Sequence, residues 1–426
     1  MAENTSLSYR NQLMYCAFVR NYSAEGSFEA LRRDLKRIRE LGTDILWLMP
    51  IHPLGEKNRK GSLGSPYAIR DYRAVNPEFG SMEDFRRLVE DVHALGMKCI
   101  IDVVYNHTAP DSVLAESHPE WFYHRADGSF GNRIGDWTDV IDLDYSNAAL
   151  WDYQIETLKM WAEIVDGFRC DVAPMVPLAF WQRARQEVET VRPGCFWLSE
   201  SGEPGFIRYL RSQNLTGLSD GELYTAFDAN YDYDIVEDFL AAASDRRTLA
   251  RYAQAVTQQE ILYPANYLKL RFLENHDRSR AAQLFADEER LRCWTSLQFF
   301  LKGIPLVYNG QEAGAVHRPS LFDRDTVDWQ GGVDLTPLIK RLAEIRRHPI
   351  FAEGQFELSA ADESVLLGTY RRGEERCVGL FPVGGQGTLL KVDAPDGSYT
   401  DLLSGKSVEV AFGAVSCGKD PVIFMA

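Results

Sequence analysis

Polar side chains that could do chemistry lie at the ends of four apolar segments of this 426-residue sequence. The segments are 99–107, 167–171, 195–200 and 272–277, and their polar residues are Asp102, Asn106, His107, Arg169, Asp171, Glu200, His276 and Asp277. Side chains along a strand alternate between its two faces, so Arg169 and Asp171 share one face. If that face points into a closed barrel, Arg169 is expected to hold Asp171 ionised.

Two kinds of chemistry could use these groups. A metal hydrolase would draw its ligands from imidazole and carboxylate groups, here His107, His276, Asp102 and Asp277. Glycoside hydrolysis by paired carboxylates would use an aspartate of low pKa as the nucleophile and a glutamate of raised pKa as the acid/base. The chain has 8 histidines and no His-x-His pair, which favours the paired carboxylates.

Each position alone also has a structural explanation, because an aspartate or asparagine at a strand end often caps the following helix. That explanation is weaker when four strands end in this way. Carboxylates, two histidines and an arginine gathered at one end of a barrel would repel or desolvate one another. Such an unfavourable cluster is expected only where the groups have a function. The pattern therefore predicts a functional site.

The chain between residues 13 and 348 alternates short apolar segments with helical patterns. The apolar segments are typical of buried parallel strands; they are 13–19, 45–50, 99–105, 167–172, 195–200, 269–273, 304–308 and, more weakly, 222–227. Helices are expected over 28–41, 82–95, 148–165, 178–191, 235–243, 291–301 and 335–347. Eight strands alternating with helices predict a (β/α)8 TIM barrel, with an open doubly wound sheet as the alternative.

Two regions depart from this alternation. Residues 108–147 are irregular and aromatic-rich, and they predict a short domain inserted after the third strand. Residues 349–426 contain strand patterns at 364–370, 376–381, 388–392 and 408–412, separated by glycine-containing turns, and predict a small antiparallel β-sandwich domain. The barrel would then consist of residues 1–107 and 148–348.

Composition excludes several classes of protein. The net charge of −16 argues against nucleic acid as a partner, because phosphate binding needs a basic surface. No apolar run approaches the roughly 18–20 residues that cross a bilayer, and the polar N-terminal residues predict no secretory signal. Seven scattered cysteines without a CxxC pair are typical of buried thiols in a reducing cytoplasm.

The four polar segments resemble the four sequence signatures of the α-amylase family, glycoside hydrolase family 13. Residues 102–107 read D-x-x-x-N-H, 167–173 read G-F-R-x-D-x-A, 198–200 end in Glu200, and 272–277 read F-x-x-N-H-D. Other similar stretches are 65–72, 76–80 and 308–312. The resemblance runs nearly end to end, in the family's order. It implies a barrel with an inserted domain B and a C-terminal β domain C.

The resemblance also implies catalytic roles. Asp171 would be the nucleophile that forms a covalent glycosyl-enzyme, Glu200 would protonate the leaving oxygen and then activate water, and Asp277 would stabilise the distorted sugar. A retaining mechanism of this kind needs two carboxyl groups about 5–5.5 Å apart, which neighbouring strand ends can supply. Glu203 lies close to Glu200 in the sequence, but Glu200 directly ends the apolar segment and is the preferred acid/base.

Five further residues would bind the sugar or hold the site, again by resemblance. Arg169 would orient Asp171, and Asp102 would hold the scaffold partly through Arg169. The sugar-binding residues would be His107, His276 and, stacked under the ring, Tyr67. In the inserted segment, Trp121, Phe122, Tyr123 and Trp137 could form sugar-stacking walls, but we expect a small local core instead.

Two positions depart from the family's pattern. Many members carry Lys-His after the second signature, where this chain has Pro174 and Met175. The backbone of that histidine often helps to hold a structural calcium, so we expect no required metal or other cofactor, although Asn106, Asp139 or Asp142 could supply oxygen ligands. Val172 follows the nucleophile, and in this family valine there occurs in members that cleave α-1,6 bonds or several linkages.

The resemblance thus implies an enzyme: a retaining, cytoplasmic glycoside hydrolase that acts on α-linked oligosaccharides. The bonds would be α-1,4 bonds of maltooligosaccharides or α-glucans, with α-1,6 bonds as a further candidate, and they would be cleaved by double displacement. The alternatives are a glucanotransferase with the same residues and a non-catalytic sugar-binding homologue, against which the intact carboxylates argue. The sequence leaves linkage, endo or exo mode, chain length and oligomeric state open.

Overall fold

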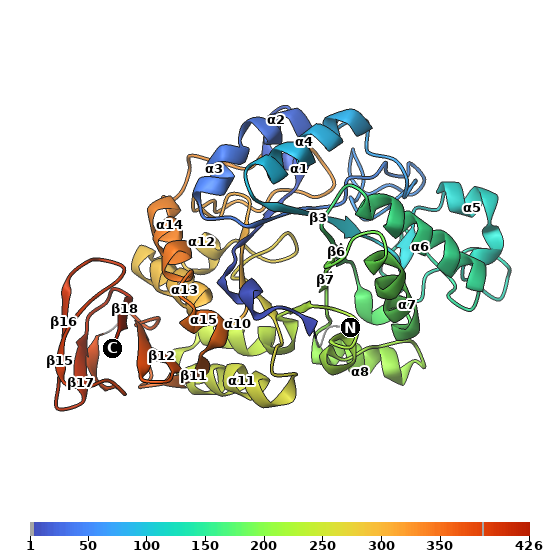
Figure 1. Ribbon diagram of the computed structural model, residues 1–426. Helices are drawn as coiled ribbons and strands as arrows, with labels where there is room; N and C mark the ends of the chain where they lie inside the picture. Colours follow the sequence, from blue (N-terminus) through green and yellow to red (C-terminus); the bar gives the residue numbers. More distant parts are fainter. Residues whose placement is uncertain (1–3, 386) are drawn as a thin grey trace.

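Eight parallel strands close into a barrel at the centre of the computed structural model, which describes residues 4–385 and 387–426 (Figure 1). Around the barrel the strands are ordered β1-β10-β9-β8-β7-β6-β3-β2. Their bounds are β1 Met14–Ala17, β2 Ile45–Leu48, β3 Lys98–Val103, β6 Gly167–Cys170, β7 Phe196–Ser199, β8 Ala229–Tyr231, β9 Lys269–Arg271 and β10 Ile304–Tyr308. The predicted TIM barrel is confirmed, and the open doubly wound sheet is excluded.

The register of three neighbouring strands brings polar side chains together. Asp102 on β3 pairs with Arg169 on β6, and Arg169 pairs with Leu198 on β7. Because the strands are parallel, their carboxyl ends meet at one face of the barrel. The residues that follow β6 and β7, Asp171 and Glu200, therefore emerge beside one another.

Helices surround the barrel, and most of them share one hydrophobic core with its strands. Their bounds are α1 Val19–Tyr22, α2 Phe28–Arg33, α3 Leu35–Glu40, α4 Met82–Ala94, α6 Ala148–Ala162, α7 Leu178–Glu189, α8 Pro204–Ser212, α9 Asp220–Leu223, α10 Val236–Ser244, α11 Leu249–Leu262, α12 Ala281–Leu284, α13 Glu288–Phe300, α14 Thr336–Ile345 and α15 Ile350–Glu353. In α4, a capping box of Ser81 and Asp84 starts the helix. Gly96, with φ +72°, lies just beyond its end.

The structure corrects two predicted elements. The strand predicted at 222–227 is wrong: a capping box between Ser219 and Glu222 starts the short helix α9 there, and the eighth strand is β8, a few residues later. The helix predicted over 28–41 is divided into α2 and α3 at Asp34, whose ψ is 0°. Helices α8 and α11 were not among the predicted helices.

The segment between β3 and α6 forms a small lobe on the side of the barrel away from the C-terminal domain (Figure 1). It contains β4 His107–Thr108 paired antiparallel with β5 Ile141–Asp142, the helix α5 Val113–Ser117 and a 3-10 turn at Pro119–Trp121. Trp121 and Phe122 are buried, but they belong to the main hydrophobic core of the molecule and not to a separate core of the inserted segment, which is where the sequence placed them. The domain boundaries predicted from sequence stay predictions; the first of them divides β4.

The C-terminal region forms two four-stranded antiparallel sheets, at the left of Figure 1. One sheet has the order β11-β12-β13-β18 and the other β14-β17-β16-β15. The bounds are β11 Gln355–Ala360, β12 Leu366–Arg372, β13 Glu375–Phe381, β14 Thr388–Lys391, β15 Gly397–Thr400, β16 Ser407–Ala411, β17 Ala414–Cys417 and β18 Val422–Met425. Val378 and Phe424 from the first sheet share one apolar cluster with Val410 and Val415 from the second. This packing confirms the predicted β-sandwich.

All seven cysteines are buried and none is in a disulfide, as expected for thiols that act as small apolar side chains. Within residues 4–385 and 387–426, no helix has both the length and the apolar character needed to cross a bilayer.

Candidate active site

One guanidinium group contacts three carboxylates at the carboxyl end of the barrel. Nη1 of Arg169 lies 2.8 Å from Oδ1 of Asp102 and 2.8 Å from Oδ1 of Asp171. Nη2 of Arg169 lies 3.0 Å from Oε2 of Glu200. The structure thus brings together four of the predicted site residues, which come from β3, β6 and β7 or directly follow these strands.

A second group, made by Tyr67, His276 and Asp277, lies beside the first. Nε2 of His276 is 2.7 Å from the hydroxyl of Tyr67 and 3.1 Å from Oδ2 of Asp277. The Tyr67 hydroxyl also donates a hydrogen bond of 3.4 Å to Oδ2 of Asp102, which links the two groups. The rings of Tyr67 and His276 are stacked at 5.5 Å, and the Tyr67 ring covers the Arg169 guanidinium at 5.6 Å.

His107 completes the predicted set. Its Nε2 atom lies 3.9 Å from Oδ2 of Asp171, and its Nδ1 atom lies 3.1 Å from the side-chain amide of Asn106. Trp137 from the inserted lobe packs against the His107 ring at 5.5 Å. Burial lowers the pKa of His107 to about 4, so the ring is neutral near neutral pH. All eight predicted site residues therefore converge on one location.

Burial is the largest influence on the pKa of each of the two inner aspartates, Asp102 and Asp171. Burial and then the charge of Glu200 raise the pKa of Asp171 well above its ordinary value, although Arg169 opposes them. Burial likewise raises the pKa of Asp102 to about 6 against the effect of Arg169. This result corrects the expectation that Arg169 simply holds Asp171 ionised: one cation cannot offset three neighbouring carboxylates in a desolvated site.

Asp277 has the opposite shift. Desolvation acts to raise the pKa of Asp277, but the interactions with His276, Arg169 and Arg278 together outweigh it and bring the value down to about 2. The Asp277 side chain is 44% exposed. Among the three predicted catalytic carboxylates it is the most exposed, since Asp171 and Glu200 have side chains 7% and 14% exposed. Asp277 therefore stays charged at the open side of the site.

The residue after Asp171 has an unusual backbone. Val172 adopts the left-handed conformation, with φ 41° and ψ 40°, which β-branched residues rarely occupy. In this conformation its N–H donates a hydrogen bond of 2.9 Å to Oε2 of Glu200. The Val172 side chain packs in an apolar cluster that includes Trp137 and Phe206. The turn that follows β6, next to the candidate nucleophile Asp171, thus holds one carboxylate oxygen of Glu200.

Glu203 has a different environment from Glu200. It precedes α8 and forms an ion pair with Arg278, whose guanidinium lies over the Tyr233 ring at 4.9 Å. Its side chain is 34% exposed. This pairing agrees with the preference for Glu200 as the acid/base candidate.

Two aromatic residues in the site were missed by sequence reasoning. The ring of Trp47 on β2 lies 5.3 Å from the Arg169 guanidinium and 6.0 Å from the His276 ring. The hydroxyl of Tyr231 on β8 accepts a hydrogen bond of 3.1 Å from Nε of Arg169. Trp47 could have been found from its place in a predicted strand, whereas Tyr231 lies in the strand that was misassigned.

Two of the three candidate calcium ligands, Asp139 and Asp142, are each engaged with a protein group through one carboxylate oxygen. Asp139 forms an ion pair of 2.8 Å with Lys60, and Oδ2 of Asp142 accepts a hydrogen bond of 2.7 Å from the N–H of Arg133. Oδ1 of Asp142 is buried without a partner. Across the described residues, histidine, cysteine and carboxylate side chains nowhere gather in a group of three that could hold a metal. The residues present do not fit a calcium site with a dense set of charged ligands.

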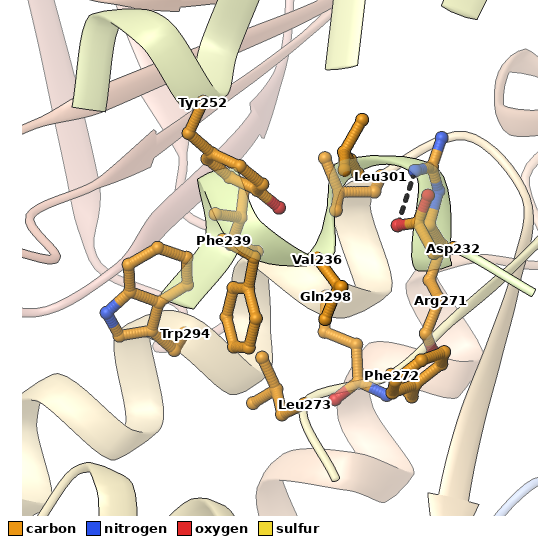
Figure 2. Close-up of a pocket in the computed structure, with 12 residues that line it drawn as sticks. Asp232, Val236, Phe239, Tyr252, Arg271, Phe272, Leu273, Trp294, Gln298 and Leu301 are labelled. Carbon is orange, nitrogen blue, oxygen red and sulfur yellow. Dashed lines mark hydrogen bonds and ion pairs between the residues drawn. The ribbon is translucent and has the colours of Figure 1, made fainter. Parts of the chain in front are cut away.

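A small internal cavity lies apart from these groups, between β9, α10, α11 and α13 (Figure 2). Its volume is about 20 Å3, and its wall includes Phe239, Trp294 and the ion pair of Asp232 with Arg271, whose atoms are 2.7 Å apart. A volume of this size accommodates about one water molecule. It is a packing cavity and not a site for a sugar.

Comparison with known proteins agrees with this geometry. Residues 18–122 and 115–349 match the family model described as "Alpha amylase, catalytic domain", and residues 357–424 match "Bacterial Alpha amylase C-terminal domain". The crystal structure of an α-amylase from Lactobacillus plantarum is 49% identical, with a TM-score of 0.96 over 99% of this chain and 100% of that one. A noncanonic maltogenic α-amylase, AmyB from Thermotoga neapolitana, is 33% identical, with a TM-score of 0.87 over 98% of both chains.

Curated relatives include longer proteins. An α-1,4-glucan:maltose-1-phosphate maltosyltransferase from Salinibacter ruber is 34% identical over 235 residues, which are 49% of this chain and 35% of that protein. The chain spans about a third of the length of such relatives. Because the catalytic-domain model covers most of the barrel and the site residues converge within it, the chain belongs to the α-amylase family, glycoside hydrolase family 13.

Proposed function

We propose that this protein is a retaining glycoside hydrolase that cleaves α-glucosidic bonds in maltooligosaccharides or other α-glucans. The observation that carries the proposal is the placement of the Asp171 and Glu200 carboxylates, from neighbouring strand ends, on the same Arg169 guanidinium. Double displacement requires two carboxyl groups close together that flank the scissile bond. The similarity to an α-amylase and to a maltogenic α-amylase supports the substrate class.

In the first step Asp171 attacks the anomeric carbon. Oδ1 of Asp171 is bound by Arg169, which leaves Oδ2 to form the new carbon–oxygen bond. Oε2 of Glu200 is bound by the Val172 N–H, which leaves Oε1 to carry the proton. As the glycosidic carbon–oxygen bond breaks, this proton passes to the leaving oxygen.

In the second step the ionised Glu200 accepts a proton from water, whose oxygen attacks the anomeric carbon. The bond to Asp171 breaks, and both carboxyl groups return to their starting state. The reactive form of the pair therefore holds one proton, on Glu200. Burial and the charge of an ionised Glu200 raise the pKa of Asp171, so two charged carboxylates side by side are disfavoured, and protonation of Glu200 removes that charge. Such a pair titrates as a unit.

The remaining groups bind the reacting sugar in this proposal. Asp277 and His276, which are 3.1 Å apart, would take hydrogen bonds from or give them to neighbouring hydroxyls. His107 is neutral near neutral pH and would bind another hydroxyl near Asp171. Tyr67 supplies an apolar ring beside them. Interactions that strengthen as the sugar ring flattens raise the rate of the chemical step.

Transfer of the glycosyl group to a sugar is the second candidate. It uses the same residues, and the similarity to relatives named maltosyltransferases supports it. The two functions differ only in whether water or the hydroxyl group of a second sugar attacks the glycosyl-enzyme. A non-catalytic sugar-binding role has less support, because it would not need Asp171, Glu200 and Asp277 together.

We further propose that the reaction needs no metal or organic cofactor and takes place in the cytoplasm. The engagement of Asp139 by Lys60 and of Asp142 by the Arg133 backbone supports the first point. Seven buried free thiols support the second, because they are typical of a reducing compartment.

Product analysis tests the proposal. The enzyme is incubated with maltotriose, maltoheptaose, isomaltose, pullulan and sucrose, and early products are followed by NMR. We expect shorter α-glucans whose first-formed anomer is α, because two displacements preserve the configuration. The β-anomer as first product would contradict the retaining mechanism, and products longer than the substrate would favour transfer. No cleavage of any α-glucoside would overturn the function.

A further inference from the structure

Arg20 is a fully buried residue on α1, directly after β1, that no catalytic role explains. Nη1 of Arg20 donates hydrogen bonds to two backbone carbonyls, 3.0 Å to Gly64 and 3.1 Å to Leu321. Nη2 lies 3.3 Å from Oε2 of Glu78, which balances the charge. Glu78 belongs to the stretch 76–80, which resembles other members of the family but whose function the sequence does not indicate.

The two carbonyls belong to loops far apart in the chain. Gly64 lies in the loop 55–66 after β2, and Leu321 lies in the loop 309–335 after β10. The loops also contact each other: the N–H of Leu63 donates to the carbonyl of Phe322 at 2.9 Å, and the N–H of Ser62 donates to Oδ1 of Asp323 at 2.8 Å. Arg20 thus connects the two loops from a buried position, whereas the direct contacts between the loops include exposed side chains.

Each loop also reaches the candidate active site. The loop 55–66 leads directly into Tyr67, whose hydroxyl contacts His276 at 2.7 Å. In the other loop, Nη1 of Arg318 donates a hydrogen bond of 2.9 Å to the backbone carbonyl of Asp277. A shift of either loop would therefore displace one of the two groups proposed to hold the sugar.

The next residue, Asn21, reinforces the same connection. Its side-chain amide donates to the carbonyl of Ser320 at 2.6 Å, and its backbone carbonyl accepts the N–H of Val327 at 2.9 Å. Asn21 holds only the loop after β10, whereas Arg20 holds both loops. A planar guanidinium with several donors can satisfy carbonyls in different directions, which a lysine ammonium group does less well.

We propose that Arg20 is a positioning residue of the active site: it ties the loops after β2 and β10 together and thereby sets the positions of Tyr67 and Asp277 for the bound sugar. The inference rests on the proposed function for its substrate. Asp171, Glu200 and Arg169 are held by barrel strands and not by these loops, so loss of the tie would weaken sugar binding more than the chemical step.

The test compares Arg20→Met and Arg20→Lys with Arg10→Met as a matched control. Arg10 is also a buried arginine whose donors reach only backbone carbonyls, those of Ala352, Ala265 and Tyr267, near the amino end of β9. Hydrogen exchange is measured for peptides that cover 60–67 and 318–327, and KM and kcat are measured on maltotriose and maltoheptaose.

We expect faster exchange in both peptides of Arg20→Met, an increase in KM of about tenfold, and a kcat within about threefold of wild type. Arg20→Lys should have a KM between those of Arg20→Met and the wild type, because its ammonium group can still donate hydrogen bonds to some of the same carbonyls. Arg10→Met should lower the melting temperature without these changes. Asp323→Ala, which removes the hydrogen bonds that Asp323 accepts from Ser62 and Ser320 but leaves Arg20 in place, should act in the same direction with a smaller effect and serves if Arg20→Met does not fold.

Unchanged exchange in both loops, or faster exchange with an unchanged KM, would overturn the inference while an active wild-type enzyme leaves the proposed function intact. A fall in kcat equal to that in kcat/KM would also overturn it, because it would indicate damage to the carboxylates. A wild-type protein without activity on any α-glucoside would instead overturn the proposed function, and the sugar-positioning role would fail with it.

Discussion

The backbone N–H of Val172 donates a hydrogen bond of 2.9 Å to Oε2 of Glu200. Val172 makes this bond in a left-handed conformation that is costly for a β-branched residue, and backbone strain of this kind is often retained at functional sites. It connects the residue after the candidate nucleophile to the candidate acid/base. The turn after β6 therefore orients both carboxylates relative to each other, before any sugar binds.

The first prediction concerns these carboxylates. Asp171→Asn and Glu200→Gln should each lower kcat on maltoheptaose by about a thousandfold or more, because each removes a group used in the covalent step. Both substitutions nearly preserve the shape of the side chain, so the circular dichroism spectrum should not change. Steady-state kinetics with a natural, unactivated substrate provides the measurement.

Glu203→Gln is the control for Glu200→Gln. Glu203 is three residues away and paired with Arg278, and its loss should change kcat by no more than about threefold. If Glu203→Gln were the inactive variant and Glu200→Gln kept more than about a tenth of the wild-type rate, the acid/base assignment would be reversed.

The pH dependence should reflect the pair formed by Asp171 and Glu200. Burial and the charge of Glu200 raise the pKa of Asp171, and only its ionised form attacks. Activity should therefore decline, as the pH falls, at a pH above the ordinary aspartate pKa of about 3.9. If the charge of Arg169 had the larger effect instead, the pKa of Asp171 would be lowered, and activity would persist to a pH below the ordinary aspartate pKa.

Glu200→Gln isolates the electrostatic part of that shift. The variant lacks the neighbouring negative charge, so the pKa of Asp171 should fall and the acid limb of kcat/KM should move to lower pH. The measurement uses an α-glycosyl fluoride, whose leaving group needs no acid. An acid limb that stays in place, or that moves to higher pH, would show that Glu200 does not act on Asp171 in this way.

Chelation should leave the enzyme active. Because Asp139 is paired with Lys60 and Pro174 and Met175 occupy the positions after the second signature, we expect full activity after exhaustive dialysis against EDTA. Calcium added to the chelated protein should raise the melting temperature by less than about 2 °C, since a ligand stabilises the fold only by binding it. A rise of many degrees would reveal a calcium site around the unpartnered Oδ1 of Asp142.

Short substrates should be preferred. The inserted lobe contains only short elements, β4, α5 and β5, and remote subsites can convert binding energy into rate only if they exist. We expect a higher kcat/KM on α-glucosides of about two to seven units than on soluble starch. Rates per bond on amylose that clearly exceed those on maltotriose would indicate a long open cleft.

The amino-acid sequence alone determined the barrel and the identity of its polar strand ends. Apolar segments such as 304–308 indicate strands that are buried on both faces. This pattern lies within a few consecutive residues, so it can be recognised from the sequence. The eighth strand was misplaced because β8 is only Ala229–Tyr231, and the capping residues Ser219 and Glu222 just before it specify a helix. Short elements carry too little periodicity to predict.

Only the tertiary structure decided the direction in which the pKa of Asp171 is shifted and the connection made by Arg20. The sequence shows that Arg169 is two residues from Asp171, and this proximity suggested an ionised aspartate. It does not show that Asp102 and Glu200 share the same guanidinium in a buried site, and a pKa depends on the sum of desolvation and all nearby charges. Likewise, Gly64 and Leu321 are neighbours of Arg20 only because the closed barrel places the ends of β1, β2 and β10 side by side.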